Sequence, residues 1–152
     1  IGMQLGGTIK NVFAIGAGLC EGLNLGDNAQ AALLTRGLAE MTRIGVASGG
    51  RRETFMGLSG VGDLIVTCYS RHSRNQTVGR RLAEGKSLQE ILDVLGMVAE
   101  GVPNTLSVYE IARKLGVRTP LIDAVYSVLY ESKPPMEALV ELMTRDPRPE
   151  LD

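Results

Sequence analysis

Apolar residues recur at helical spacing along most of the chain, and patterns that alternate with the period of a strand are rare. Residues 6–18 are apolar or small on nearly every side, which is typical of a buried helix. Amphipathic stretches follow up to Met143, separated by glycine-rich turns and by Pro134-Pro135. The run Ile65-Val66-Thr67 is too short and too close to glycine to indicate a strand. The pattern predicts an all-α, multi-helix domain.

Local signals predict where these helices begin and end. The expected N-caps are side chains that accept a hydrogen bond from a free backbone N–H: Asp27 or Asn28, Ser73, Ser87, Asn104 and Thr119. Gly116 is expected to close the helix that ends at Leu115. In the second helix Arg36, Glu40 and Arg43 share a face away from the apolar stripe, where we expect their charges to support one another.

Lys10 lies inside the otherwise apolar first helix. Its amine could extend to water along an aliphatic stem, or it could be held in the interior for a chemical purpose. Burial lowers the pKa of a lysine because it disfavours the charged form, and a protein can obtain an amine base near neutral pH in this way. The pattern leaves both alternatives open.

Two further segments carry candidate chemistry. If a helix starts after Gly62, Asp63 and Thr67 stand one turn apart on the same face. Asp63 could simply complement the helix dipole, or it could bind a substrate hydroxyl and hold the lysine amine. The run from Ser73 to Asn75 combines a helix N-terminus with the planar donors of Arg74, which suits a phosphate or another small anion.

Composition and charge exclude several classes of function. The 152 residues carry a net charge of −1, so no electrostatic attraction to nucleic acid or to an anionic membrane is built in. No apolar run approaches the length of a membrane span. His72 is the one histidine, which excludes a multi-histidine metal site, and we expect no metal. Cys20 and Cys68 lack metal-ligand spacing and fit a reducing compartment, which predicts a cytoplasmic location.

The two ends of the chain and a glycine pair bear on its organisation. The chain begins at Ile1 without an initiator methionine and enters an ordered-looking segment at once, so we expect a fragment of a longer protein. Residues 1–146 are expected to form one helical domain, and residues 147–152 a frayed tail. Gly16 and Gly18 lack the third glycine of a dinucleotide fingerprint and are expected to allow close packing of helices.

Six blocks of sequence, taken together and in order, resemble the C-terminal half of the NAD(P)-dependent glycerol-3-phosphate dehydrogenases, with the bacterial branch the nearer match. They are GGTIKN at 6–11, LGDN at 25–28, TRGLAEM at 35–41, GDL at 62–64, SRN at 73–75 and VAEG at 98–101. The blocks extend over nearly the whole chain, and six in order with family spacing are far more specific than any one alone.

The resemblance implies a helical substrate domain similar to the C-terminal domain of the 6-phosphogluconate dehydrogenases. It implies an enzyme that interconverts sn-glycerol 3-phosphate and dihydroxyacetone phosphate, supplying glycerol 3-phosphate for phospholipid synthesis. The implied cofactor is NAD or NADP, bound mainly by an N-terminal Rossmann domain that this chain lacks, so the chain alone should be inactive. Because the family's ribose-binding residue lies in that domain, the choice between NAD and NADP stays open. A homodimer also stays open.

The resemblance also implies roles for individual residues. Lys10 matches the catalytic lysine, which exchanges a proton with the C2 oxygen. Positions that line the substrate in the family correspond to Asn11, Asp63, Thr67, Ser73, Arg74 and Asn75. Positions near the cofactor correspond to Arg74, Val98 and Glu100. Gln76-Thr77 stands where many bacterial relatives carry a second basic residue, so the affinity for an anion could differ.

Two other functions remain as alternatives. One is a non-enzymatic helical module for dimerisation or regulation, which explains the small-residue faces but not the joint presence of Lys10, Asp63 and Arg74. The other is a related hydroxy-acid or phosphogluconate dehydrogenase, against which the run from Ser73 to Asn75 argues.

Overall fold

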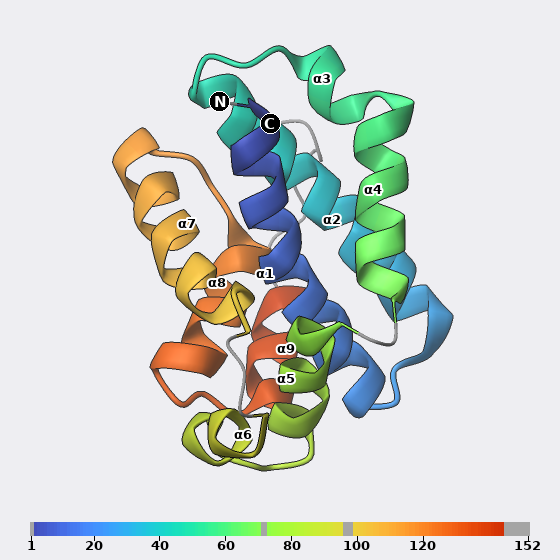
Figure 1. Cartoon of the computed structure of the whole chain (residues 1–152), viewed down its shortest axis with the longest axis vertical. Helices are drawn as coiled ribbons and strands as arrows, with labels where there is room; N and C mark the ends of the chain where they lie inside the picture. The colour runs from blue at the N-terminus through green and yellow to red at the C-terminus, as the bar shows by residue number, and fades with distance from the viewer. Residues whose placement is uncertain (1, 71–72, 96–98, 145–152) are drawn as a thin grey trace.

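Helix α1 (Gly2–Gly22) runs through the middle of the molecule, and the other helices pack around it (Figure 1). The computed structural model of the chain describes residues 2–70, 73–95 and 99–144, and in that part every regular element is a helix. After α1 come α2 (Gly26–Ala47), α3 (Arg52–Met56), α4 (Leu58–Tyr69), α5 (Arg74–Ala83), α6 (Leu88–Leu95), α7 (Gly101–Leu115), α8 (Pro120–Tyr130) and α9 (Pro135–Met143). The all-α prediction is confirmed. The expected tail at 147–152 lies outside the described residues.

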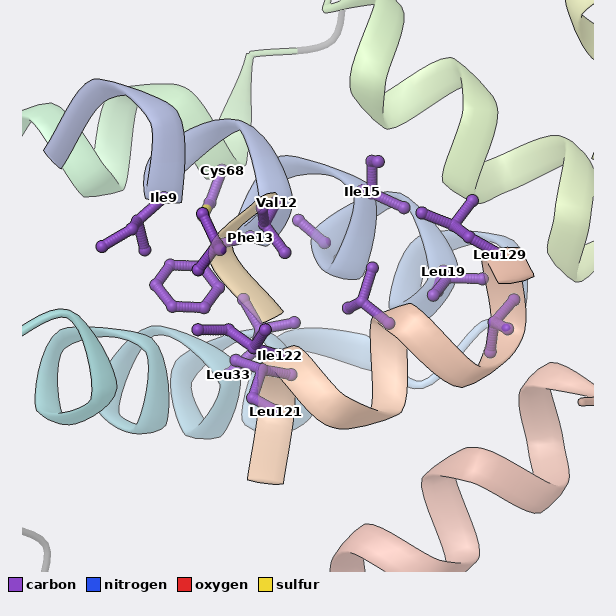
Figure 2. Close-up of a cluster of buried hydrophobic side chains, with 14 of the residues drawn as sticks. Ile9, Val12, Phe13, Ile15, Leu19, Leu33, Cys68, Leu121, Ile122 and Leu129 are labelled. Carbon is purple, nitrogen blue, oxygen red and sulfur yellow. The ribbon is translucent and has the colours of Figure 1, made fainter. Parts of the chain in front are cut away.

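The core forms around α1 because nearly every side of that helix is apolar or small. Ile9, Val12, Phe13 and Ile15 are completely buried. Figure 2 shows these α1 side chains in one cluster with side chains from three other helices. Those are Leu33 of α2, Cys68 of α4, and Leu121, Ile122 and Leu129 of α8. Burial on every side is what the sequence pattern of this helix predicts.

Close approach between α1 and α5 depends on glycine. A Cβ built on Gly18 would collide with the backbone carbonyl of Gln76, and one built on Gly79 would collide with the carbonyl of Ile15. Backbone therefore packs against backbone where these two helices cross. The expectation that small residues of the first helix allow close packing is confirmed, and the contact holds the start of α5 against α1.

Several of the predicted helix caps and stops are present in the structure. Ser73 Oγ accepts a hydrogen bond from Gln76 N at 3.3 Å, and Ser87 Oγ accepts one from Glu90 N at 3.2 Å. Gly116 adopts a left-handed conformation with φ of 68°, as a glycine after a helix end commonly does. These signals act within a few residues, so neighbouring sequence is sufficient to set them.

Other predicted helix starts are wrong. The α2 helix begins at Gly26, so Asp27 lies in its first turn and neither Asp27 nor Asn28 caps it. The turn after α1 is tight, since Leu25 N donates to Cys20 O, and the next helix starts at once. The α7 helix begins at Gly101, before Asn104, because a side chain from α5 accepts the N–H of Gly101. The α4 helix begins at Leu58 and not after Gly62, and Asp63 and Thr67 still stand one turn apart on it.

Glu40 is the largest departure from the sequence prediction. It is 1% exposed rather than part of a solvated charged face. Its two carboxyl oxygens accept hydrogen bonds from Leu121 N at 2.6 Å and Ile122 N at 3.1 Å, so it caps α8 from another helix. Thr119 occupies the predicted N-cap position but makes no capping bond, and its hydroxyl donates to Asp123 Oδ1 at 3.2 Å instead.

Candidate active site

Lys10 and Asp63 form the centre of the site. Lys10 Nζ lies 3.3 Å from Asp63 Oδ2, which joins α1 to α4 across 53 residues of sequence. The side chain of Lys10 is 22% exposed and that of Asp63 is 67% exposed. The amine is thus neither sealed in the apolar core nor surrounded by water, because its stem is covered and its head meets a carboxylate. This contact agrees with the alternative in which Asp63 holds the lysine amine.

Asp63 reaches this position from the middle of α4, so a favourable interaction with the helix N-terminus does not account for it. Thr67 lies one turn further along α4, and its hydroxyl donates to Asp63 O at 2.7 Å. The carbonyl of Thr67 accepts a hydrogen bond from Gln76 Nε2 at 2.9 Å. Gln76 is 1% exposed and ties the end of α4 to the start of α5. Sequence reasoning treated Gln76 as a missing basic residue and did not find this role.

The start of α5 presents the run from Ser73 to Asn75. Ser73 caps the helix, and Arg74 is its exposed first residue. Asn75 is half-buried, and its Oδ1 accepts a hydrogen bond from Gly101 N at 2.8 Å. One residue of the predicted anion site therefore also fixes the start of α7.

Gly101 occupies a position that no larger residue fits. A Cβ there would lie 2.6 Å from Asn75 Oδ1 and 2.8 Å from the backbone carbonyl of Asn11. The close approach joins α1, α5 and α7 at one point and brings the exposed Glu100 to the edge of the site. Sequence reasoning selected Glu100 and missed Gly101, although the glycine directly after it was a usable signal.

Contacts therefore connect most of the predicted site residues that the structure describes, and Arg74 and Glu100 adjoin these contacts in sequence. Contacts run from Lys10 to Asp63, through α4 and Gln76 to the start of α5, and from Asn75 to Gly101 and back to Asn11. The residues that this network links or flanks are Lys10, Asn11, Asp63, Thr67, Ser73, Arg74, Asn75 and Glu100. Val98 and His72 lie outside the described residues.

Other reactive groups are inert or dispersed. Burial raises the pKa of the Cys20 thiol to about 11 and that of the Cys68 thiol to about 12, so neither supplies a thiolate near neutral pH. Among the described residues, no group of three or more His, Cys, Asp or Glu side chains is placed to hold a metal ion. In the same part of the chain, no helix is both long and apolar enough to cross a membrane.

The arrangement combines two chemical capacities. An amine held by a carboxylate can exchange a proton with a bound hydroxyl or carbonyl oxygen. A capped helix N-terminus with an exposed arginine can bind an anion. The network of hydrogen bonds places these capacities on neighbouring helices that contact one another.

The chain matches one family of known proteins. The family model described as the NAD-dependent glycerol-3-phosphate dehydrogenase C-terminus matches residues 1–140. A glycerol-3-phosphate dehydrogenase, NAD(P)+, from Syntrophotalea carbinolica is 54% identical over 152 residues, which are 100% of this chain and 46% of that protein. A protein of the same name from Geobacter sp. strain M21 is 56% identical over 146 residues, which are 96% of this chain and 44% of that protein.

A solved structure shows the same fold. The crystal structure of glycerol-3-phosphate dehydrogenase from Coxiella burnetii matches with a TM-score of 0.89 and 43% identity, over 95% of this chain and 44% of that one. This chain therefore spans less than half the length of the relatives it matches. The family match extends over all four helices that build the site. The chain belongs to the NAD-dependent glycerol-3-phosphate dehydrogenase family, and it corresponds to the C-terminal domain of that family.

Proposed function

We propose that this chain is the substrate-binding half of a dehydrogenase that interconverts sn-glycerol 3-phosphate and dihydroxyacetone phosphate with NAD or NADP. The observation that carries the proposal is the Lys10–Asp63 pair, tied through Gln76 to the capped start of α5. A proton-exchanging group and an anion-binding group on one framework suit a phosphorylated alcohol. The names of the relatives support the same reaction. A non-enzymatic helical module gives no reason for this convergence.

In this proposal Lys10 exchanges the proton of the reaction. During oxidation its neutral amine accepts the proton of the C2 hydroxyl, and during reduction its ammonium donates a proton to the C2 carbonyl oxygen. Asp63, 3.3 Å from Nζ, keeps the amine in one place and accepts a hydrogen bond from a substrate hydroxyl. We assign Asn11 and Thr67, which lie beside this pair on the same two helices, to contacts with the substrate.

The phosphate is held at the start of α5. Free backbone N–H groups at a helix N-terminus favour an anion, and the Arg74 guanidinium adds charge-assisted hydrogen bonds. We assign Ser73 and Asn75 to the same group. Binding energy from this remote phosphate orients C2 against Lys10, which is how a non-reacting part of a substrate raises the rate.

The donor set of this chain fits one end of a dinucleotide. Arg74 and Glu100 are exposed at the edge of the site, where a guanidinium suits phosphate oxygens and a carboxylate suits hydroxyl groups. We assign these two residues and Val98 to that contact. We assign the strand–turn–helix that binds a pyrophosphate to a Rossmann domain outside this chain, because the chain covers only 46% of its relative from Syntrophotalea carbinolica. When bound, the nicotinamide supplies the hydride acceptor or donor. The enzyme would work in the cytoplasm and supply glycerol 3-phosphate for phospholipids.

The test is Lys10→Met in the full-length parent protein. Loss of general acid–base catalysis should lower kcat by about 10²–10⁴-fold, because the variant can no longer exchange the C2 proton. Dinucleotide binding, measured by titration, should be nearly unchanged. Lys114→Met, an exposed lysine in α7, is the matched control and should keep wild-type kcat. A Lys10→Met enzyme with near-wild-type kcat would remove Lys10 as the proton-exchanging group. Dehydrogenase turnover by the 152-residue chain alone would contradict the proposal that a separate domain binds most of the dinucleotide.

A further inference from the structure

A cavity of about 460 Å³ lies between α9 and the bundle formed by α1, α2 and α8. Its volume falls within the range of roughly 300–1,000 Å³ that is common for small-molecule sites. Leu19 and Cys20 of α1 form one wall, Val125 of α8 forms another, and Leu139 and Leu142 of α9 face them. None of the lining residues belongs to the Lys10–Asp63 site, so this is a separate feature.

The cavity exists because α9 packs loosely. Ala138 is the one residue of α9 that is fully buried, while Leu139 and Leu142 are half-buried and line the cavity instead of filling the core. Val140, on another side of the helix, is 51% exposed. The gap therefore opens along the whole inner side of a peripheral helix, which leaves room for an elongated guest.

Arg36 gives the cavity its chemistry. It is the single charged residue among the described residues that line the cavity, and Asn28 is the other side chain there that can form hydrogen bonds. Arg36 is half-buried and forms no hydrogen bond or ion pair with any described residue. A guanidinium against an apolar wall offers planar donors that match a carboxylate, and no acidic side chain of the described lining residues occupies them.

We propose that this cavity binds a single aliphatic chain that carries a carboxylate head, as in a medium-chain fatty acid. The chain lies among the apolar residues of α1, α8 and α9, and the carboxylate pairs with Arg36. Charge complementarity selects this ligand class, because a neutral apolar guest would leave the guanidinium without a partner and a cation would be repelled by it. The site is independent of the proposed dehydrogenase reaction.

The test is isothermal titration of the 152-residue chain with decanoate and, separately, with decyltrimethylammonium. These probes share the aliphatic chain and differ in the sign of the head group. Decanoate should bind saturably and at least about tenfold more tightly than the cation, since one charge-assisted contact accounts for one to two decades of affinity. Arg36→Gln should remove that advantage, because decanoate loses its charged partner and the cation no longer meets a like charge. Arg52→Gln, an exposed arginine in α3, should leave both affinities unchanged.

A second variant tests the cavity itself. Ala32 is an exposed residue of α2 at the rim, and Ala32→Phe should place a ring in the cavity and abolish binding of both probes while the circular dichroism spectrum stays helical. Three results would overturn the proposal: equal affinity of the wild-type chain for the two probes, a preference for decanoate that Arg36→Gln leaves unchanged, or binding that survives Ala32→Phe. Two other results would also overturn the proposal, because they would mean that the protein itself fills the cavity. One is decanoate binding that is seen only after deletion of residues 145–152, and the other is decanoate binding that disappears when the chain dimerises.

Discussion

Replacing Glu40 with alanine should destabilise the protein far more than any exposed acidic substitution. Glu40 of α2 is 1% exposed and accepts the N–H groups of Leu121 and Ile122 at 2.6 and 3.1 Å. Without it, two backbone donors at the start of α8 are left buried and unsatisfied. Each such donor costs about 1–3 kcal/mol, so the loss is about 2–6 kcal/mol in the free energy of unfolding. That is a large share of the roughly 5–15 kcal/mol that stabilises a domain.

Glu40→Gln separates the hydrogen bonds from the charge. The amide keeps one acceptor oxygen but turns its NH₂ group toward the second backbone N–H, so about half of the loss is expected, roughly 1–3 kcal/mol. Chemical denaturation followed by far-ultraviolet circular dichroism measures both variants. Glu110→Ala, an exposed residue of α7, is the control and should change the free energy of unfolding by less than about 0.5 kcal/mol.

The pH dependence gives an independent check. Burial raises the pKa of Glu40 from 4.5 to about 8; the hydrogen bonds from α8 and the charge of Arg43 lower it, and Asp123 raises it. Between these two values the unfolded chain has lost the proton and the folded chain keeps it. This contribution to stability is therefore complete below pH 4.5 and is lost as the pH rises to about 8. The slope is at most about 1.4 kcal/mol per pH unit.

Wild type should therefore lose stability relative to Glu40→Gln as the pH rises through that range. The measurement is the difference between the two free energies of unfolding at pH 5, 6, 7 and 8, taken in one buffer series of constant ionic strength. A difference that does not change with pH would refute the burial argument. A Glu40→Ala variant that loses less than about 1 kcal/mol would refute the assignment of Glu40 as the cap of α8.

Three further predictions concern the close helix contact, the cap of α5 and the phosphate. Gly18→Ala should lower the free energy of unfolding by at least about 2 kcal/mol, because its Cβ meets the backbone of Gln76; Gly6→Ala, where nothing lies within 4 Å, should not lower it. Ser73→Ala should lower it by about 1 kcal/mol through loss of the cap; an unchanged denaturation midpoint would contradict this. Arg74→Ala in the full-length parent should raise KM for glycerol 3-phosphate at least about tenfold, with partial rescue by Arg74→Lys. If Arg74→Ala weakened the reaction of unphosphorylated glycerol equally, Arg74 would not be the residue that binds the phosphate.

Local sequence was sufficient for the helices and for several of their ends. The caps at Ser73 and Ser87 and the stop at Gly116 depend on hydrogen bonds and backbone angles within a few residues, so the sequence alone predicts them. The all-round burial of α1 was also predictable, because small and apolar residues leave that helix no solvent face.

Tertiary structure decided the ends that are capped from elsewhere. The side chain of Asn75 fixes the start of α7 from 26 residues away, and Glu40 fixes the start of α8 from 81 residues away. No local pattern reports such a partner. For the same reason Glu40 was expected on a solvated face, since its charged neighbours Arg36 and Arg43 are visible in the sequence and the buried end of α8 is not.

The sequence by itself determined which chemical groups the site could contain: a lysine in an apolar helix, an aspartate, and an arginine at a helix start. Only the packed structure decided that Lys10 and Asp63 lie 3.3 Å apart and that Gly101 brings α7 against Asn11 and Asn75. The physical reason is the distance along the chain over which each kind of interaction acts. Helix propensity and capping act within a turn or two, whereas the distance between two side chains on different helices depends on how closely every intervening pair of helices can pack.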